Sequence, residues 1–138
     1  MKVSICRTNR GYRFQLSHIV SGPSKAIRPL LFEPDQWPRW GPLLTDVKSP
    51  AEQLQPGMEG QVQLLGFLWV SFRVVEVTRT YWRWTVAGMS PPADGHFIRT
   101  IGDRRTEIGF QLPLWAPFYL PFCYWALKNI QSLLQQQD

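Results

Sequence analysis

The stretch from Glu33 to Pro42 constrains the fold more than any other part of the chain. It reads Glu-Pro-Asp-Gln-Trp-Pro-Arg-Trp-Gly-Pro and places Trp37 and Trp40 among three prolines. Proline excludes a long helix or a central strand here, and tryptophan is costly to leave in water. We therefore expect a short, stiff aromatic element that covers something apolar, which is either a packed core or a ligand cavity.

The size and composition of the chain fit one folded domain. Its 138 residues suffice to bury a core, and the apolar share of 44% with only 18% charged residues excludes a disordered chain. Aromatic residues reach 14% and include seven tryptophans. This content favours either a dense aromatic core or a large apolar pocket.

The net charge of +5 is concentrated at the N-terminus. The first 28 residues contain six of the fifteen basic residues and no acidic residue, whereas the remainder contains nine basic and ten acidic residues. The main body is therefore almost neutral, which argues against nucleic-acid binding. We expect a basic, solvated arm over residues 1–10 and one domain over residues 11–138.

Motifs for metals, cofactors and nucleophilic catalysis are missing from the sequence. His18 and His96 are each isolated in a predicted strand, and no P-loop, dinucleotide fingerprint or nucleophile elbow occurs. We expect no cofactor and no metal. The two cysteines, Cys6 and Cys123, are far apart, and the N-terminus lacks the apolar segment of a secretory signal, so we expect a cytoplasmic protein.

Alternation with a period of two predicts a mostly antiparallel sheet. In the first strand, Tyr12, Phe14 and Leu16 alternate with polar residues. A short helix from Lys25, with Ser24 as its cap, and the Trp37–Trp40 block follow that strand. Seven strands are predicted: Tyr12–Val20, Leu43–Lys48, Met58–Phe67, Trp69–Thr78, Tyr81–Ala87, His96–Ile101 and Thr106–Leu112.

The period changes to 3.6 residues from about Phe118, which predicts a C-terminal amphipathic helix. Its apolar side contains Tyr119, Phe122, Cys123, Ala126, Leu127, Ile130, Leu133 and Leu134. No charge occurs from Ile108 to Leu127, but the prolines at 113, 117 and 121 argue against a membrane-spanning helix. We therefore expect a strand that leads into a buried helix.

The order of these elements resembles the START-like superfamily, which includes Bet v 1-like, polyketide cyclase/dehydrase and lipid transport proteins. The resemblance covers residues 12–135 and depends on several pieces in sequence. These pieces are the strand and helix over residues 17–31, Asp35–Pro42 continuing to Val47, the turn Leu54–Gly57, Val74–Val77 followed by Trp82–Trp84, and the final helix over Leu127–Leu134.

The resemblance implies an α+β helix-grip fold, in which a curved sheet wraps around the long C-terminal helix. A cavity between sheet and helix holds hydrophobic ligands in such proteins. Strand parity independently indicates which side chains face inward. The predicted cavity lining is Trp40, Val62, Leu64, Phe72, Val74, Trp82, Trp84, Phe110, Leu112, Phe122, Ala126 and Ile130.

Three functions remain open from the sequence. The leading hypothesis is the binding of an apolar or aromatic small molecule or lipid, with His96, Tyr81 and Glu107 as candidate polar anchors. The first alternative is an enzyme of the cyclase or dehydratase kind that uses one of these groups as acid or base. The second is a peripheral membrane or partner-binding surface at Trp115, Phe118 and Tyr119. Glu107 and Glu76 could instead form ion pairs with arginines on the outer face of the sheet.

Overall fold

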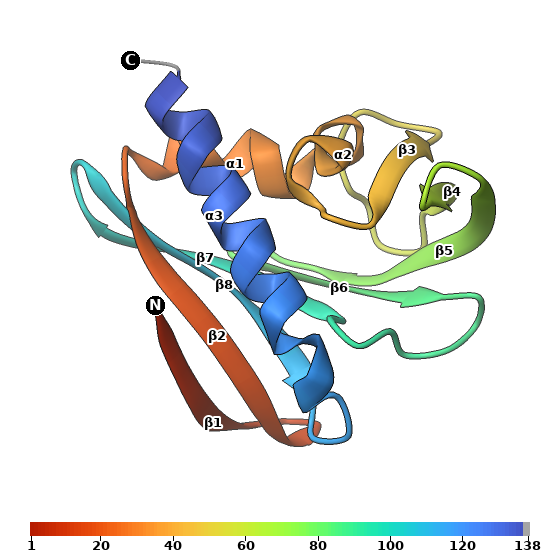
Figure 1. Cartoon of the computed structure of the whole chain (residues 1–138), viewed down its shortest axis with the longest axis horizontal. Helices are drawn as coiled ribbons and strands as arrows, with labels where there is room; N and C mark the ends of the chain where they lie inside the picture. Colours follow the sequence, from red (N-terminus) through yellow and green to blue (C-terminus); the bar gives the residue numbers. More distant parts are fainter. Residues whose placement is uncertain (137–138) are drawn as a thin grey trace.

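Eight antiparallel strands form one curved sheet in the computed structural model, which describes residues 1–136. Their spatial order is β1-β2-β8-β7-β6-β5-β4-β3, so β1 lies at one edge and β3 at the other (Figure 1). The strands are β1 Lys2–Thr8, β2 Gly11–Ser21, β3 Leu44–Lys48, β4 Glu59–Leu64, β5 Leu68–Val77, β6 Tyr81–Val86, β7 Gly95–Gly102 and β8 Arg105–Pro113.

The helices lie on one face of this sheet. The long helix α3 (Leu120–Gln136) crosses the concave face, and the short helices α1 (Ser24–Phe32) and α2 (Trp37–Trp40) cover the same face near one end (Figure 1). Single turns, η1 (Pro34–Gln36) and η2 (Pro117–Tyr119), precede α2 and α3. This is the helix-grip arrangement that the order of elements predicts.

The predicted alternation sets the two faces of the sheet. Phe14 of β2 pairs with Leu112 of β8, and Leu16 pairs with Phe110, so these four side chains point toward α3. The intervening positions carry small or polar side chains on the convex face. In α3 the buried side chains recur every three or four residues, as expected for a helix with one apolar side: Cys123, Ala126, Leu127, Ile130 and Leu134.

Glycine is required at one place in the centre of the sheet. A Cβ atom on Gly109 of β8 would lie 2.5 Å from the carbonyl oxygen of Leu16 and 2.6 Å from the Phe97 ring. Phe97 of β7 therefore occupies the space above Gly109 on the convex face. A larger residue at position 109 would push β2, β7 and β8 apart.

Both tryptophans of the Trp-Pro-Arg-Trp block are buried in the core. The indole nitrogen of Trp37 donates a hydrogen bond to the Leu31 carbonyl at 3.0 Å, and that of Trp40 donates to the Leu30 carbonyl at 2.6 Å. The acceptors are carbonyls near the C-terminal end of α1, which lack partners within the helix. The block thus fixes the corner between α1 and α2.

The N-terminal segment corrects two expectations. The chain has eight strands instead of seven, because residues 1–10, expected as a solvated arm, contain β1, which pairs with β2 from Lys2 to Thr8. Moreover, Arg10 lies in the β1–β2 turn and is paired with a buried carboxylate, Asp94. Ser24 does not cap α1, since its hydroxyl shares hydrogen bonds with Thr100 and Thr106.

The charge-free stretch from Ile108 to Leu127 forms three different elements. It begins in β8, passes through η2 and continues into the first two turns of α3. Among residues 1–136, no helix is both long enough and apolar enough to span a bilayer.

Candidate functional site

A cavity of about 80 Å³ lies between the sheet, α2 and the first half of α3. Its walls are aromatic and its mouth is formed by prolines from two loops. The lining comprises Trp37, Trp40, Gly41, Pro42, Leu44, Trp82, Trp84, Pro91, Pro92, Ala93, His96, Phe110, Tyr119, Phe122, Cys123 and Ala126.

Four tryptophans from two parts of the chain form the floor of the cavity. Trp37 of α2 stacks on Trp82 of β6 with ring centroids 4.9 Å apart, and its plane stands at 70° to Trp84. Trp40 stacks on Phe110 of β8 at 5.7 Å. Such offset and edge-to-face contacts hold the rings in fixed orientations, so the wall is preformed.

His96 places an imidazole in this aromatic wall. Its ring stacks on Trp82 at a centroid distance of 3.7 Å and faces the edges of Trp84 and Phe110. The residue is only 3% exposed, and its Nδ1 atom has no hydrogen-bond partner within the protein. Burial lowers the pKa of the imidazole to about 3, against weaker opposing contributions from the Trp82 backbone and Asp94. The ring is therefore neutral at physiological pH.

The other ionisable groups of the lining are also uncharged. Burial raises the pKa of Tyr119 to about 12, and it raises the pKa of the Cys123 thiol to about 12. Tyr119 stacks on Phe122 at 5.1 Å beside the mouth. The cavity therefore offers an aromatic surface with neutral hydrogen-bonding groups, which suits an uncharged guest.

The loop that forms one side of the mouth is tied down by a buried carboxylate. Asp94, which is 1% exposed, follows Pro91, Pro92 and Ala93. Its Oδ2 atom accepts hydrogen bonds from Arg10 Nη1 at 2.9 Å and from Ser90 Oγ at 3.1 Å, and its Oδ1 atom accepts one from Arg13 Nη2. The β1–β2 hairpin thus holds the β6–β7 loop in place.

The predicted lining divides into two groups. Trp40, Trp82, Trp84, Phe110, Phe122 and Ala126 line the cavity. The remaining predicted residues point toward the same side of the sheet but do not reach the cavity. Of these, Val62, Phe72, Val74, Leu112 and Ile130 fill the core, and Leu64 is half-buried at the end of β4.

Two of the three candidate polar anchors lie outside the cavity, contrary to the prediction. Tyr81 neighbours the inward-facing Trp82 in β6 and therefore lies on the convex face, where its hydroxyl accepts a hydrogen bond from Arg10 at 3.2 Å. Glu107 lies on the same convex face and pairs with Arg99 at 2.6 Å. Neither group lines the cavity, so His96 alone of the three lies there. Glu76 likewise forms an ion pair, with Arg83.

The sequence interpretation missed several cavity residues. Tyr119 and Cys123 were assigned to the apolar side of the last helix, and that assignment already placed them beside Phe122 and Ala126. Trp37 was treated mainly as a structural residue. No sequence pattern indicated that Pro91 and Pro92 line the cavity, because only the tertiary structure brings their loop to the same cavity as residues of α3.

A second, larger hollow lies on the convex face of the sheet. Its volume is about 710 Å³, but it is wide open to solvent and its lining includes the polar side chains of Glu59, Gln61, Ser71 and Arg73. It lacks the enclosed apolar wall of the cavity. Residues 1–136 also contain no group of three or more His, Cys, Asp or Glu side chains placed to hold a metal ion.

Known structures share this architecture at low sequence identity. XoxI from Bacillus cereus superimposes with a TM-score of 0.70 at 10% identity, covering 91% of this chain and 98% of that one. Ara h 8.0201, a Bet v 1-like protein, gives 0.53 at 12% identity, with coverage of 88% and 97%. The chain has the helix-grip fold.

A third similar structure is the Aha1 dimer from Colwellia psychrerythraea. It gives a TM-score of 0.58 at 16% identity and covers 86% of this chain and 92% of that one. No family model matches the sequence, and no curated protein matches it either. The likeness is therefore one of fold, the helix-grip arrangement that the order of elements predicted.

Proposed function

We propose that this protein binds a small, uncharged apolar or aromatic molecule that carries one hydrogen-bonding group. The observation that supports this proposal is the His96 imidazole, whose Nδ1 atom is buried in the cavity wall without a partner. A buried polar atom without a hydrogen bond is destabilising by about 1–3 kcal/mol. A ligand group that hydrogen-bonds to the imidazole after a small shift of the ring or its neighbours would recover this energy on binding.

The size of the cavity limits the part of the ligand that is enclosed. The volume of about 80 Å³ is smaller than the roughly 150 Å³ of an engineered cavity that holds benzene. A single ring therefore requires a shift of the proline loops at the mouth. A longer apolar molecule would insert one end and leave the remainder in the mouth between Pro42 and Pro92.

A hydroxyl is the ligand group that best matches His96. A neutral imidazole nitrogen either donates or accepts a hydrogen bond according to its tautomer, and a hydroxyl satisfies both cases. A carboxylate or ammonium would lose its hydration against an uncharged aromatic wall. Phenolic and alcoholic compounds are therefore favoured over acids and amines.

The cyclase or dehydratase alternative has less support from the geometry. Of its three candidate groups only His96 lines the cavity, because Tyr81 and Glu107 lie on the convex face. A general base is most effective when its pKa lies near the working pH, and that of His96 is lowered to about 3. We therefore favour binding over catalysis.

Phenol and toluene form a matched pair of probes for this proposal, since they differ by one hydroxyl for methyl. Binding is measured by chemical-shift changes of the indole N–H signals in NMR titrations. We expect phenol to bind more tightly than toluene by about three- to tenfold, the value of one net hydrogen bond. His96→Phe, which keeps the ring stack, should abolish this preference.

Ala126→Leu is the control for the location of the site, because it places extra carbon in the cavity. It should weaken both probes equally. The proposal fails if neither probe perturbs the cavity residues, or if Ala126→Leu leaves both affinities unchanged. Native mass spectrometry of the purified protein gives an independent check, since a co-purifying apolar compound is expected.

A further inference from the structure

Two charge-free segments of the chain contribute residues to the cavity, and a third is hydrogen-bonded to the residue next to its lining. They are residues 60–72, 84–93 and 108–127, which contain no Asp, Glu, Lys or Arg. The first contains the β4–β5 turn, the second the β6–β7 loop, and the third η2 and the start of α3. Segments so far apart in sequence have no local reason to share this composition.

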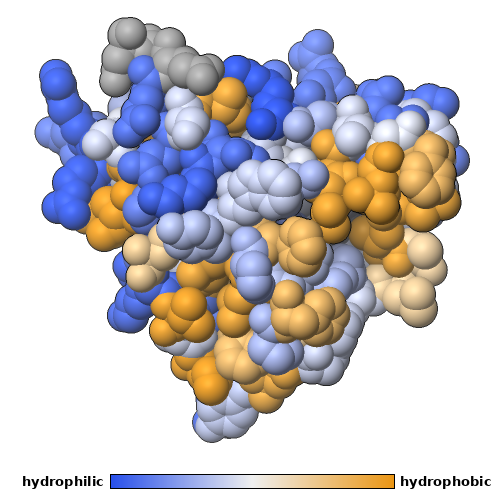
Figure 2. Space-filling view, in the orientation of Figure 1, coloured by the Kyte–Doolittle hydropathy of each residue, from blue (hydrophilic) through white to orange (hydrophobic). Residues whose placement is uncertain are grey.

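Each segment exposes large apolar side chains. We call the group of Leu65, Phe67, Met89, Trp115, Phe118 and Trp125 the apolar collar; all six are exposed, from 52% for Trp125 to 72% for Phe67. Figure 2 shows apolar residues gathered over the end of the β4–β5 hairpin and over the first turns of α3, on the face that α3 covers. Apolar patches gathered on the surface of a soluble protein commonly mark an interaction site.

The β4–β5 hairpin tip is unusual for a turn. Turns generally carry Gly, Asn, Asp or Ser, whereas this one reads Leu64-Leu-Gly-Phe-Leu68. Leu65 adopts a positive φ of 56°, a conformation that leucine rarely occupies. Its amide donates to the Leu43 carbonyl at 3.0 Å, next to Leu44, which lines the cavity. The tip is therefore joined directly to the mouth.

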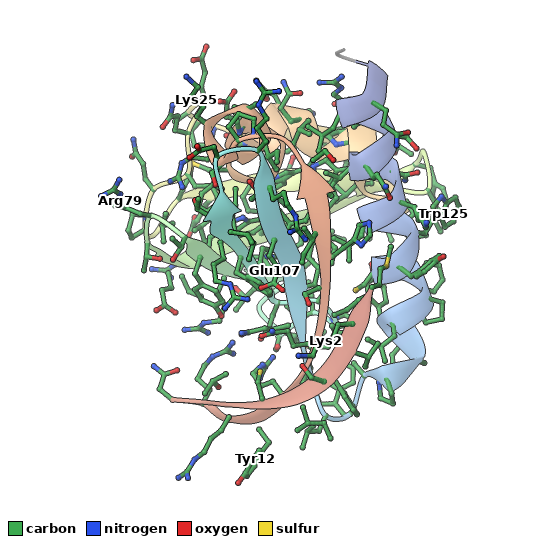
Figure 3. The ribbon with its side chains drawn as sticks, turned by 90° about the vertical axis from the view of Figure 1, so that its left-hand side faces the viewer. Lys2, Tyr12, Lys25, Arg79, Glu107 and Trp125 are labelled. Carbon is green, nitrogen blue, oxygen red and sulfur yellow. The ribbon has the colours of Figure 1, made fainter. Side chains whose placement is uncertain are left out.

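The other two parts of the apolar collar are joined to the mouth in the same way. Met89 lies in the loop whose Pro91 and Pro92 line the cavity. Trp115 and Phe118 have ring centroids 6.2 Å apart, and Phe118 precedes the lining residue Tyr119. Trp125 points away from the sheet, from the side of α3 opposite its buried face (Figure 3).

Several of the charged groups near the apolar collar are neutralised or lie at its border. Asp94, at the end of the β6–β7 loop, is buried between Arg10 and Arg13. Lys48 lies over the Trp69 ring at 4.4 Å, and Lys128 lies near the Tyr124 ring at 5.7 Å. Lysines that rest on aromatic rings at the border of an apolar surface can reach phosphate groups while the apolar part is buried.

We propose that the apolar collar docks the protein on a lipid surface with the mouth of the cavity facing the lipid. Charged side chains are costly in hydrocarbon, and their absence from all three segments suits insertion. The bordering lysines, Lys48 and Lys128, favour an anionic surface. A protein interface normally has a polar rim around its apolar centre, whereas these three segments carry no charged residue. In a dimer formed through the apolar collar, the cavity mouths of the two molecules would face each other.

The experiment measures partition into vesicles by flotation and by tryptophan fluorescence. The vesicles contain phosphatidylcholine alone or mixed with phosphatidylglycerol. We expect binding to both and tighter binding to the anionic mixture. The double variant Phe67→Ser/Phe118→Ser should lower the partition coefficient at least tenfold, because each large apolar side chain withdrawn from water contributes roughly tenfold or more in affinity. Bromine-labelled lipid chains should quench the fluorescence of the wild-type protein.

Val3→Ser/Ile5→Ser is the matched control, because it removes two exposed apolar side chains from β1, which lies at the edge of the sheet opposite β3 and the β4–β5 tip. It should change vesicle binding less than twofold. Loss of binding in this variant to the same extent would overturn the proposal. Absence of vesicle binding by the wild-type protein would also overturn it. A wild-type dimer that dissociates in the Phe67→Ser/Phe118→Ser variant would overturn it as well, because the apolar collar would then be a dimer interface.

The docking proposal is separable from ligand binding in the cavity. Ala126→Leu alters the cavity and leaves the apolar collar intact, so it should weaken phenol but not vesicle binding. Phe67→Ser/Phe118→Ser should do the reverse. If only one of the two activities is found, the proposal for the other fails alone.

Discussion

At the scale of single residues, His96 is the side chain on which the proposed ligand binding depends most. Its neighbours are the faces and edges of Trp82, Trp84 and Phe110, which exclude water and supply no strong hydrogen bond to Nδ1. A phenylalanine would fill the same space at no desolvation cost. The imidazole therefore lowers stability, and we interpret this as the sign of a binding role.

The pH dependence of stability tests the neutral state of His96. The unfolded chain takes up a proton at this residue below about pH 6.5, whereas the folded chain does so only near pH 3. Stability should therefore fall as pH decreases through this window, by about 2 kcal/mol between pH 7 and pH 5 from His96 alone. Urea unfolding at the two pH values gives the measurement.

His96→Phe is the control for that measurement. The variant keeps the ring stack and retains His18. Its free energy of unfolding should therefore change by about 2 kcal/mol less between pH 7 and pH 5 than that of the wild type. An equal loss of stability on acidification in both proteins would show that other groups cause the dependence.

At the scale of elements, the β1–β2 hairpin acts as a clamp on the β6–β7 loop. Arg10 and Arg13 reach across the convex face to Asp94, and Ser90 adds a bond from within the loop. This explains why the basic N-terminal segment is folded against the sheet. Because Asp94 follows Pro91 and Pro92, the clamp also sets the width of the cavity mouth.

Removing the charge of Asp94 tests this clamp. Asp94→Asn leaves the buried Arg13 guanidinium without its counter-ion and should reduce the free energy of unfolding by about 3–5 kcal/mol. Hydrogen exchange of residues 87–93 should become faster. Glu107→Gln is the control, because Arg99 is 66% exposed and such a pair contributes less than about 1 kcal/mol. Similar losses in the two variants would contradict the clamp.

The elements differ in how far the sequence predicts them. Seven strands and α3 were predicted within a few residues, because alternation and helical spacing reflect a buried face. β1 was missed although Val3 and Ile5 alternate with Ser4 and Cys6, since its basic residues suggested a solvated arm. The Arg13–Asp94 contact had no local signal, because 81 residues separate its two partners.

At the scale of the whole molecule, the cavity volume of about 80 Å³ implies that the mouth must widen for a ring to enter. Cys123 reports on this opening, because it lines the cavity and is 2% exposed. With its pKa raised to about 12, only about one thiol in ten thousand is ionised at pH 8. Its reaction with a thiol reagent therefore requires both opening and deprotonation.

Thiol labelling should separate the two cysteines. With a disulfide reagent at pH 8, Cys6, which is half-buried in the edge strand β1, should react at least a hundredfold faster than Cys123. Cys6→Ser should leave only the slow phase, and phenol should slow it further by occupying the cavity. Two equally fast thiols would show that the mouth is open in the native state.

The sequence by itself determined the secondary structure, the apolar faces and the order of elements, because each depends on the spacing of neighbouring residues. It also placed Trp37 and Trp40 in a stiff aromatic corner. Only the tertiary structure decided which inward-facing residues reach the cavity, that Tyr81 and Glu107 lie on the convex face, and that two charge-free segments contribute residues to one cavity. These features depend on the curvature of the sheet and on contacts between distant segments, which local patterns do not specify.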